Sequence, residues 1–170
     1  SWYEDKQHCF DVSVTLDGPF LRAIIEKARY LKVHVVVNCT VQREDGSATG
    51  SSLLYAPDGQ LLIDNTKQIY IGHENDFLAK ATEEGSVVET ALGRVGLYAC
   101  MDGVINETPR CLALNGAQLL INSLNSFATD EASLHIPVRA AENKVYVAAA
   151  NKVGPLVPEE MMEGISAATG

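Results

Sequence analysis

Apolar and polar positions follow two different periods along the chain, and the change between them predicts an α/β fold. Residues 20–31 place apolar side chains at helical spacing, whereas 33–40 is a run of mostly β-branched residues typical of a strand. Two further strands are predicted at 49–56 and 60–64. Pro57-Asp58-Gly59 lies between them and favours a tight turn, so the sequence predicts a hairpin.

The second half of the chain alternates strands with helices. Strands are predicted at 86–90, 93–99, 117–122 and 145–150, the last three of the type buried on both faces. Helices are predicted at 105–115 and 129–143, and Pro137 predicts a kink or a delayed start in the second. Early hairpins followed by β-α-β units indicate a layered α/β fold with a mixed sheet and outer helices, whereas residues 1–17 are expected to be irregular.

Composition narrows the possible partners and the compartment. The 170 residues suffice for one domain, and the net charge of −9 argues against nucleic-acid or anionic-membrane partners. No apolar run reaches the ~18 residues of a membrane span. The four cysteines form no Cys-x-x-Cys pair, so we expect no metal site, free thiols and a reducing, cytoplasmic location.

Cys100 occupies the most informative position in the chain. It follows the strand at 93–99, where a side chain and the next backbone N–H groups point into a crevice. That arrangement suits a nucleophile with adjacent oxyanion donors. A cysteine after an apolar strand is more often a small buried core residue, and position alone leaves both interpretations open.

Two segments resemble the nitrilase (carbon–nitrogen hydrolase) superfamily. The first is Gly-Arg-Val-Gly-Leu-Tyr-Ala-Cys-Met-Asp at 93–102, followed by Glu107 and Arg110; the second runs from Pro137 through Arg-Ala-Ala-Glu-Asn to Gly154. The hairpin at 53–63 is also similar, and the likeness covers residues 18–154. It implies an α-β-β-α sandwich, no cofactor, and hydrolysis of amides, carbamoyl groups or nitriles through a thioester or thioimidate.

The resemblance also assigns roles to individual residues. Cys100 matches the nucleophile, and Lys67, 33 positions earlier, matches a lysine that stabilises the oxyanion together with the backbone N–H of Met101. Without the resemblance, Lys67 would be taken as a solvated surface lysine. Glu74 matches a carboxylate that orients the lysine or substrate, although it also suits the N-terminus of a short predicted helix.

Six further positions complete the predicted site. Four match charged motif positions and are expected to form buried or semi-buried ion pairs that hold loops: Glu107, Arg110, Arg139 and Glu142. Asn125 and Phe127 are expected to border the substrate pocket, together with the loop at 155–163.

One family feature has no counterpart here. The family's general-base glutamate follows an early apolar strand in a Pro-Glu context, and no such strand or dipeptide precedes residue 20. Glu4 has no apolar strand before it and is not assigned this role. We therefore expect one nitrilase-like domain over residues 1–170, truncated at both ends, as an internal piece of a longer protein or a trimmed variant.

Two functions follow from these observations. The first is a cysteine-dependent hydrolase acting on a small amide, carbamoyl or nitrile substrate. The second is a non-catalytic module or inactive fragment that keeps the fold and an oligomer interface. An incomplete sheet exposes edge groups, so we expect a homo-oligomer. A papain-like hydrolase is disfavoured because none of the four histidines lies in the expected context.

Overall fold

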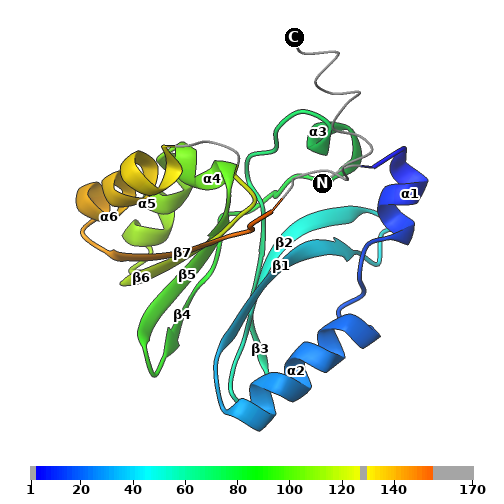
Figure 1. Ribbon diagram of the computed structural model, residues 1–170, viewed down its shortest axis with the longest axis horizontal. Helices are drawn as coiled ribbons and strands as arrows, with labels where there is room; N and C mark the ends of the chain where they lie inside the picture. The colour runs from blue at the N-terminus through cyan, green and yellow to red at the C-terminus, as the bar shows by residue number, and fades with distance from the viewer. Residues whose placement is uncertain (1–2, 127–129, 155–170) are drawn as a thin grey trace.

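The computed structural model describes residues 3–126 and 130–154, which form two sheets lying face to face between outer helices (Figure 1). The helices are α1 (Lys6–Asp11), α2 (Pro19–Leu31), α3 (Glu74–Phe77), α4 (Met101–Val104), α5 (Glu107–Leu114), the π-helix η1 (Glu131–His135) and α6 (Ile136–Asn143). The strands are β1 (Val35–Gln42), β2 (Ala48–Tyr55), β3 (Leu61–Thr66), β4 (Val87–Thr90), β5 (Gly93–Ala99), β6 (Leu119–Leu124) and β7 (Tyr146–Asn151).

The two sheets differ in strand direction. Sheet A is fully antiparallel in the order β1-β2-β3, and the predicted turn at 57–59 joins β2 to β3. Sheet B has the order β4-β5-β6-β7, in which β4 is antiparallel to β5 and the other neighbours are parallel. In Figure 1, α2 covers the outside of sheet A, and α5 and α6 cover the outside of sheet B. The predicted α-β-β-α arrangement with a mixed sheet is confirmed.

Separate clusters of buried apolar side chains join the layers. Leu54 and Ile63 of sheet A meet Val95 and Leu97 of sheet B at the centre. A second cluster seals α2 against the outer face of sheet A, and a third includes Leu112 of α5 on the outer face of sheet B. Side chains alternate between the two faces of a strand, so β2 and β5 each contribute to two of these clusters.

Three sequence predictions need correction or refinement. Residues 1–17 are not wholly irregular, because the Asp5 side chain accepts a hydrogen bond from the His8 N–H and caps α1. β7 is not buried: it pairs only with β6 among the described residues, and Tyr146 is 81% exposed. The predicted helix at 129–143 divides into η1 and α6, with Pro137 in the first turn of α6, where its missing N–H costs nothing.

None of the helices within the described ranges is long and apolar enough to cross a bilayer.

The interface between the sheets should dominate stability. Leu97→Ala removes a side chain buried at that interface and should lower the free energy of unfolding by about 2–5 kcal/mol. Leu114→Ala, at an exposed position of α5, is the matched control and should stay within about 0.5 kcal/mol of the wild type. Urea denaturation followed by circular dichroism measures both values. Equal losses in the two variants would contradict the assignment of the core.

Candidate active site

Cys100 lies directly after β5, in a backbone conformation that few residues other than glycine adopt. Its φ is 49° and its ψ is −109°, and α4 begins at the next residue. The Cys100 N–H donates to the Asn122 side-chain oxygen at 2.8 Å and to the Ser123 carbonyl at 3.0 Å. The Cys100 carbonyl accepts from the Gly103 N–H at 2.8 Å. Such strain persists only where surrounding contacts enforce it, and it is concentrated at functional sites.

The same turn leaves a different N–H group available. The Cys100 N–H is committed to β6, so it is directed away from any ligand at the turn. The Met101 N–H, at the first position of α4, has no acceptor among the described residues. A free N–H immediately after the thiol is the geometry that an oxyanion donor requires.

Asp102 ties this turn to sheet A. Its carboxylate is 1% exposed and accepts hydrogen bonds from the backbone N–H groups of Gln68 at 3.1 Å, Ile69 at 2.8 Å and Ala99 at 3.2 Å. Burial raises the pKa of Asp102 to about 6, against the lowering effect of these donors and of Lys67. Asp102 was not among the site residues predicted from the sequence. The available signal was a charged side chain two positions after Cys100, immediately beyond a buried strand.

Lys67 is not the solvated surface lysine that its residue type alone suggests. It is 7% exposed, and its Nζ lies 2.5 Å from Glu74 Oε2 and 5.3 Å from the centroid of the Tyr70 ring. Glu74 is the first residue of α3 and also accepts from the Ile71 N–H. Glu74 is therefore both a helix-terminal residue and the carboxylate partner of Lys67. Since Gln68 and Ile69 bind Asp102, Lys67 lies in the segment that is attached to the Cys100 turn.

The predicted ion pairs are present only in part. Arg139 pairs with Glu142, and it donates to the Gly103 carbonyl at 2.9 Å and to the Val104 carbonyl at 3.0 Å. Arg139 thus satisfies carbonyls of α4, the helix that follows Cys100. The prediction for Glu107 and Arg110 is wrong.

Glu107 and Arg110 are both exposed, and neither belongs to an ion pair in residues 3–126 and 130–154. Both side chains are exposed, so water solvates their charges.

The predicted pocket-border residues are partly visible. Asn125 is exposed and follows β6 directly. β5 and β6 are parallel, so their carboxyl ends meet at one edge of sheet B and place Asn125 at the same edge as Cys100. Phe127 and the loop at 155–163 lie outside the described residues.

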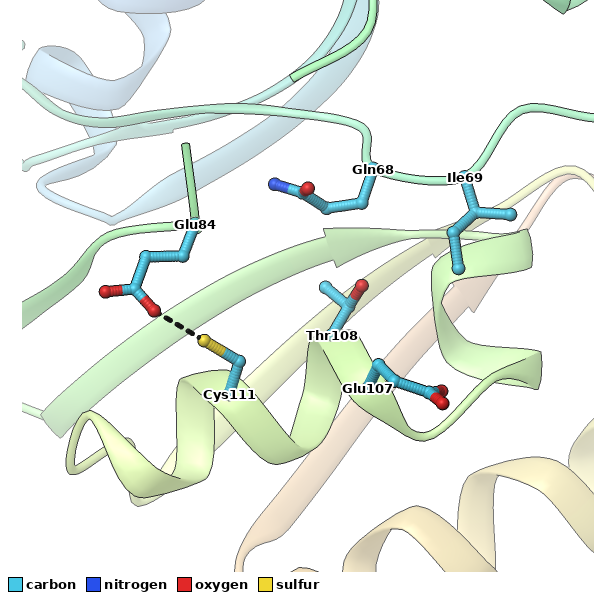
Figure 2. A pocket seen from close by; sticks show the side chains of 7 residues that line it. Gln68, Ile69, Glu84, Glu107, Thr108 and Cys111 are labelled. Atoms are coloured by element: carbon cyan, nitrogen blue, oxygen red, sulfur yellow. Dashed lines mark hydrogen bonds between the residues drawn. The ribbon is translucent and has the colours of Figure 1, made fainter. Parts of the chain in front are cut away.

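A cavity of about 280 Å³ lies beside this region but not at Cys100 (Figure 2). Its lining residues are Gln68, Ile69, Glu84, Gly85, Glu107, Thr108 and Cys111. Figure 2 shows Thr108 and Cys111 on α5 facing the Gln68–Ile69 segment, and the Cys111 thiol donates to Glu84 at 2.8 Å. The Glu84 carboxylate raises the pKa of Cys111, so this thiol stays protonated. In the described part of the chain, no three His, Cys, Asp or Glu side chains are arranged to hold a metal ion.

The sequence matches the model of the carbon-nitrogen hydrolase family over residues 1–169, and the chain therefore belongs to that family. It is 26% identical over 154 residues to a nitrilase of Pyrococcus abyssi, covering 89% of this chain and 57% of that protein. It is 30% identical over 149 residues to an (R)-stereoselective amidase of a Pseudomonas species, covering 84% and 52%. The chain thus spans a little over half the length of these relatives.

Solved structures show the same fold. An amidase from Nesterenkonia sp. matches with a TM-score of 0.76 at 24% identity, covering 90% of this chain and 59% of that one. A cysteine variant of that amidase in complex with butyramide matches with a TM-score of 0.77 at 23% identity, covering 88% and 59%. These likenesses support the four-layer arrangement described above.

Asp102 should make stability depend on pH in the acid range. An unfolded chain releases the Asp102 proton near pH 3.9, whereas the folded protein keeps it to about pH 6. The resulting stabilisation is fully present below pH ~4 and is lost as the pH rises through about 6. Urea denaturation over this range should show that component in the wild type and not in Asp102→Asn. Asp17→Asn removes an exposed carboxylate and should keep it; an unchanged profile in Asp102→Asn would contradict the assignment.

Proposed function

We propose that Cys100 is the nucleophile of a hydrolase that cleaves a small amide through a thioester intermediate. One observation carries the proposal: Asp102 joins the strained Cys100 turn to the backbone beside Lys67, a buried cation. A thiol, a cation and a free N–H thus belong to one connected structural unit. The structure of the Cys100 turn favours this function over a buried cysteine with no chemical role.

The proposed reaction proceeds in two stages. A carboxylate accepts the thiol proton, the sulfur attacks the carbonyl carbon, and Lys67 and the Met101 N–H stabilise the oxyanion. The carbon–nitrogen bond then breaks, and the nitrogen takes up the proton and leaves as ammonia or an amine. Water next attacks the thioester with help from the same carboxylate, which releases the acid and restores the thiol.

The turnover expected of these 170 residues alone depends on which carboxylate acts as the general base. In residues 3–126 and 130–154, the carboxylate paired with Lys67 is Glu74. Because Glu74 already binds the Lys67 ammonium, we propose that it orients Lys67. The chain alone should then lack general-base assistance, typically worth ~10²–10⁴-fold, and turn over slowly. The alternative function, a non-catalytic module, predicts no turnover at all.

Amides are the proposed substrate class. The similar Nesterenkonia amidase has been solved with butyramide and with acrylamide, both small uncharged amides. The similarity to a nitrilase keeps nitriles as a second proposed class. The family resemblance described above implies carbamoyl compounds as a third. The proposed hydrolysis requires no cofactor, since the Cys100 thiol supplies the nucleophile.

Cys100 should be the most reactive of the four cysteines. Iodoacetamide followed by peptide mapping should label Cys100 well before Cys9, Cys39 and Cys111, because a thiolate reacts and a thiol does not. Burial raises the pKa of Cys39 to about 11, and burial also raises that of Cys9. Equal labelling of all four cysteines in a folded sample would refute the nucleophile assignment.

Ammonia release tests the proposed chemistry directly. The 170-residue chain and a version extended upstream of Ser1 should both be assayed with an amide, a ureido compound and a nitrile. The extended version should release ammonia at least ~10²-fold faster, and Cys100→Ala should abolish release. Cys111→Ala is the matched control and should retain it. Rapid turnover by the 170-residue chain would make Glu74, or another of its carboxylates, the base.

We also propose that the chain associates with copies of itself through the open edge of β7. An unpaired strand edge offers backbone N–H and C=O groups to a second strand. The exposed Tyr146 lies at the start of this strand. Tyr146→Lys should shift the population towards monomer in size-exclusion chromatography with light scattering. Tyr30→Lys changes an equally exposed tyrosine on α2 and should have no effect; a monomeric wild type would overturn the proposal.

A further inference from the structure

Three buried polar side chains beneath the Cys100 turn have no part in the chemistry proposed above. They are Tyr98 of β5, Asn122 of β6 and Glu131 of η1. One side-chain atom of each has no hydrogen-bond partner within the described part of the chain: Tyr98 Oη, Asn122 Nδ2 and Glu131 Oε1. Unsatisfied polar atoms of this kind are rare in protein interiors, and each requires an explanation. For Asn122, the explanation is a contact that its side-chain oxygen makes with Cys100.

The side-chain oxygen of Asn122 binds the backbone of Cys100, the proposed nucleophile. Asn122 Oδ1 accepts the Cys100 N–H at 2.8 Å, a shorter contact than the 3.0 Å to the Ser123 carbonyl. The side chain therefore adds an acceptor to the one that the parallel ladder already supplies. Both contacts act on the residue whose φ is 49°. A conformation this costly needs more than one restraint, and Asn122 provides the restraint that comes from a side chain.

The packing around Asn122 fixes its orientation. Asn122 and Tyr98 are register partners in neighbouring strands, so their side chains lie on the same face of sheet B. Gly103 of α4 covers both: a Cβ at this glycine would lie 2.9 Å from Asn122 Nδ2 and 2.7 Å from the Tyr98 ring. The amide is thus confined between the sheet and α4, with its oxygen towards Cys100 and its nitrogen beside the tyrosine.

Glu131 connects this cluster to the loop after β6. Its Oε2 accepts a hydrogen bond from the Ser126 hydroxyl at 3.2 Å, and the Ser126 N–H donates to the Asn151 side chain. Burial raises the pKa of Tyr98 to about 12; the Glu131 carboxylate adds to this rise and the Asn122 amide opposes it, so both groups lie near the phenol. Glu131 also opens a π-helix, a feature that is frequent at functional sites.

We propose that Asn122 is a positioning residue for Cys100: its side-chain oxygen holds the strained turn in place, and the Tyr98 ring and Gly103 confine the amide in that orientation. The proposal deepens the assignment of Cys100 as nucleophile and rests on it. Loss of the acceptor lets the Cys100 backbone relax towards negative φ, which moves both the sulfur and the Met101 N–H. Displacements of ~1 Å at a reacting group cost as much as ~10²-fold in rate.

Asn122→Leu provides the test, because it keeps the branched shape at Cγ and removes the acceptor. In the 170-residue chain, iodoacetamide should alkylate Cys100 of this variant ~10-fold or more slowly than in the wild type, over the whole pH profile. The rates at Cys9, Cys39 and Cys111 should not change. Asn122→Ala also removes the acceptor and should slow Cys100 alkylation, so it serves if Asn122→Leu fails to fold.

Asn65→Leu is the matched control. Asn65 is also a buried asparagine that spans the two sheets, donating to the carbonyls of Leu97 and Ser86, but it makes no contact with Cys100. It should lower the melting temperature and leave the Cys100 alkylation profile unchanged. A wild-type alkylation profile in folded Asn122→Leu or Asn122→Ala would overturn the proposal, as would equal slowing by Asn65→Leu.

The experiments distinguish a failure of the proposed function of Cys100 from a failure of the positioning role of Asn122. Alkylation requires no turnover, so it reports the placement of the thiol even in a chain without general-base assistance. If Cys100→Ala retained ammonia release while Asn122→Leu slowed alkylation, the proposed function would fail and the positioning role would stand. If Cys100→Ala abolished release and Asn122→Leu changed nothing, only the positioning role would fail.

Discussion

The carboxylate of Asp102 is the contact on which the arrangement of the site depends. It accepts one backbone N–H from β5 of sheet B and two from the segment that follows β3 of sheet A. A single buried side chain therefore bridges the two halves of the sandwich at the turn that carries Cys100. Three N–H donors from two separate segments leave few alternative arrangements for the carboxylate. Because the carboxylate is buried and cannot be hydrated, losing any of these bonds is costly. The price of this arrangement is a carboxyl group whose pKa is raised to about 6.

Around that bridge, restraints on Cys100 come from several directions. Asn122 and Ser123 of β6 hold its N–H, Gly103 holds its carbonyl, and Arg139 fixes α4 from the direction of α6. These restraints come from three elements of the sheet B half, β6, α4 and α6. A positive φ at a residue with a side chain is stable only when neighbours enforce it in this way. The elements that form sheet B and its helices thus serve the geometry of one residue as well as the core.

Apolar residues are buried in most of the sandwich but exposed along β7. Between the sheets and under α2 and α5, apolar side chains are buried in continuous clusters. Along β7, by contrast, the strand lies at a sheet edge, and most of its residues are exposed although their sequence is apolar. Apolar strands with free edges pair with other strands. The composition of β7 suits burial, and the fold of residues 3–126 and 130–154 leaves it open.

Sequence periodicity alone determined most elements and a layered α/β fold with a mixed sheet, because helix and strand periods reflect which faces must be buried. The four-layer α-β-β-α class came from the resemblance to the carbon–nitrogen hydrolase family. Through the family resemblance, the motif around Cys100 and the spacing to Lys67 indicated the proposed hydrolysis by a cysteine nucleophile. Only the tertiary structure decided which charges meet. It brought Glu74 to Lys67, left Glu107 and Arg110 exposed, and placed Asp102 and Asn122 around the Cys100 turn. Those contacts join residues distant in sequence, and local periodicity carries no information about which strand end will face which loop.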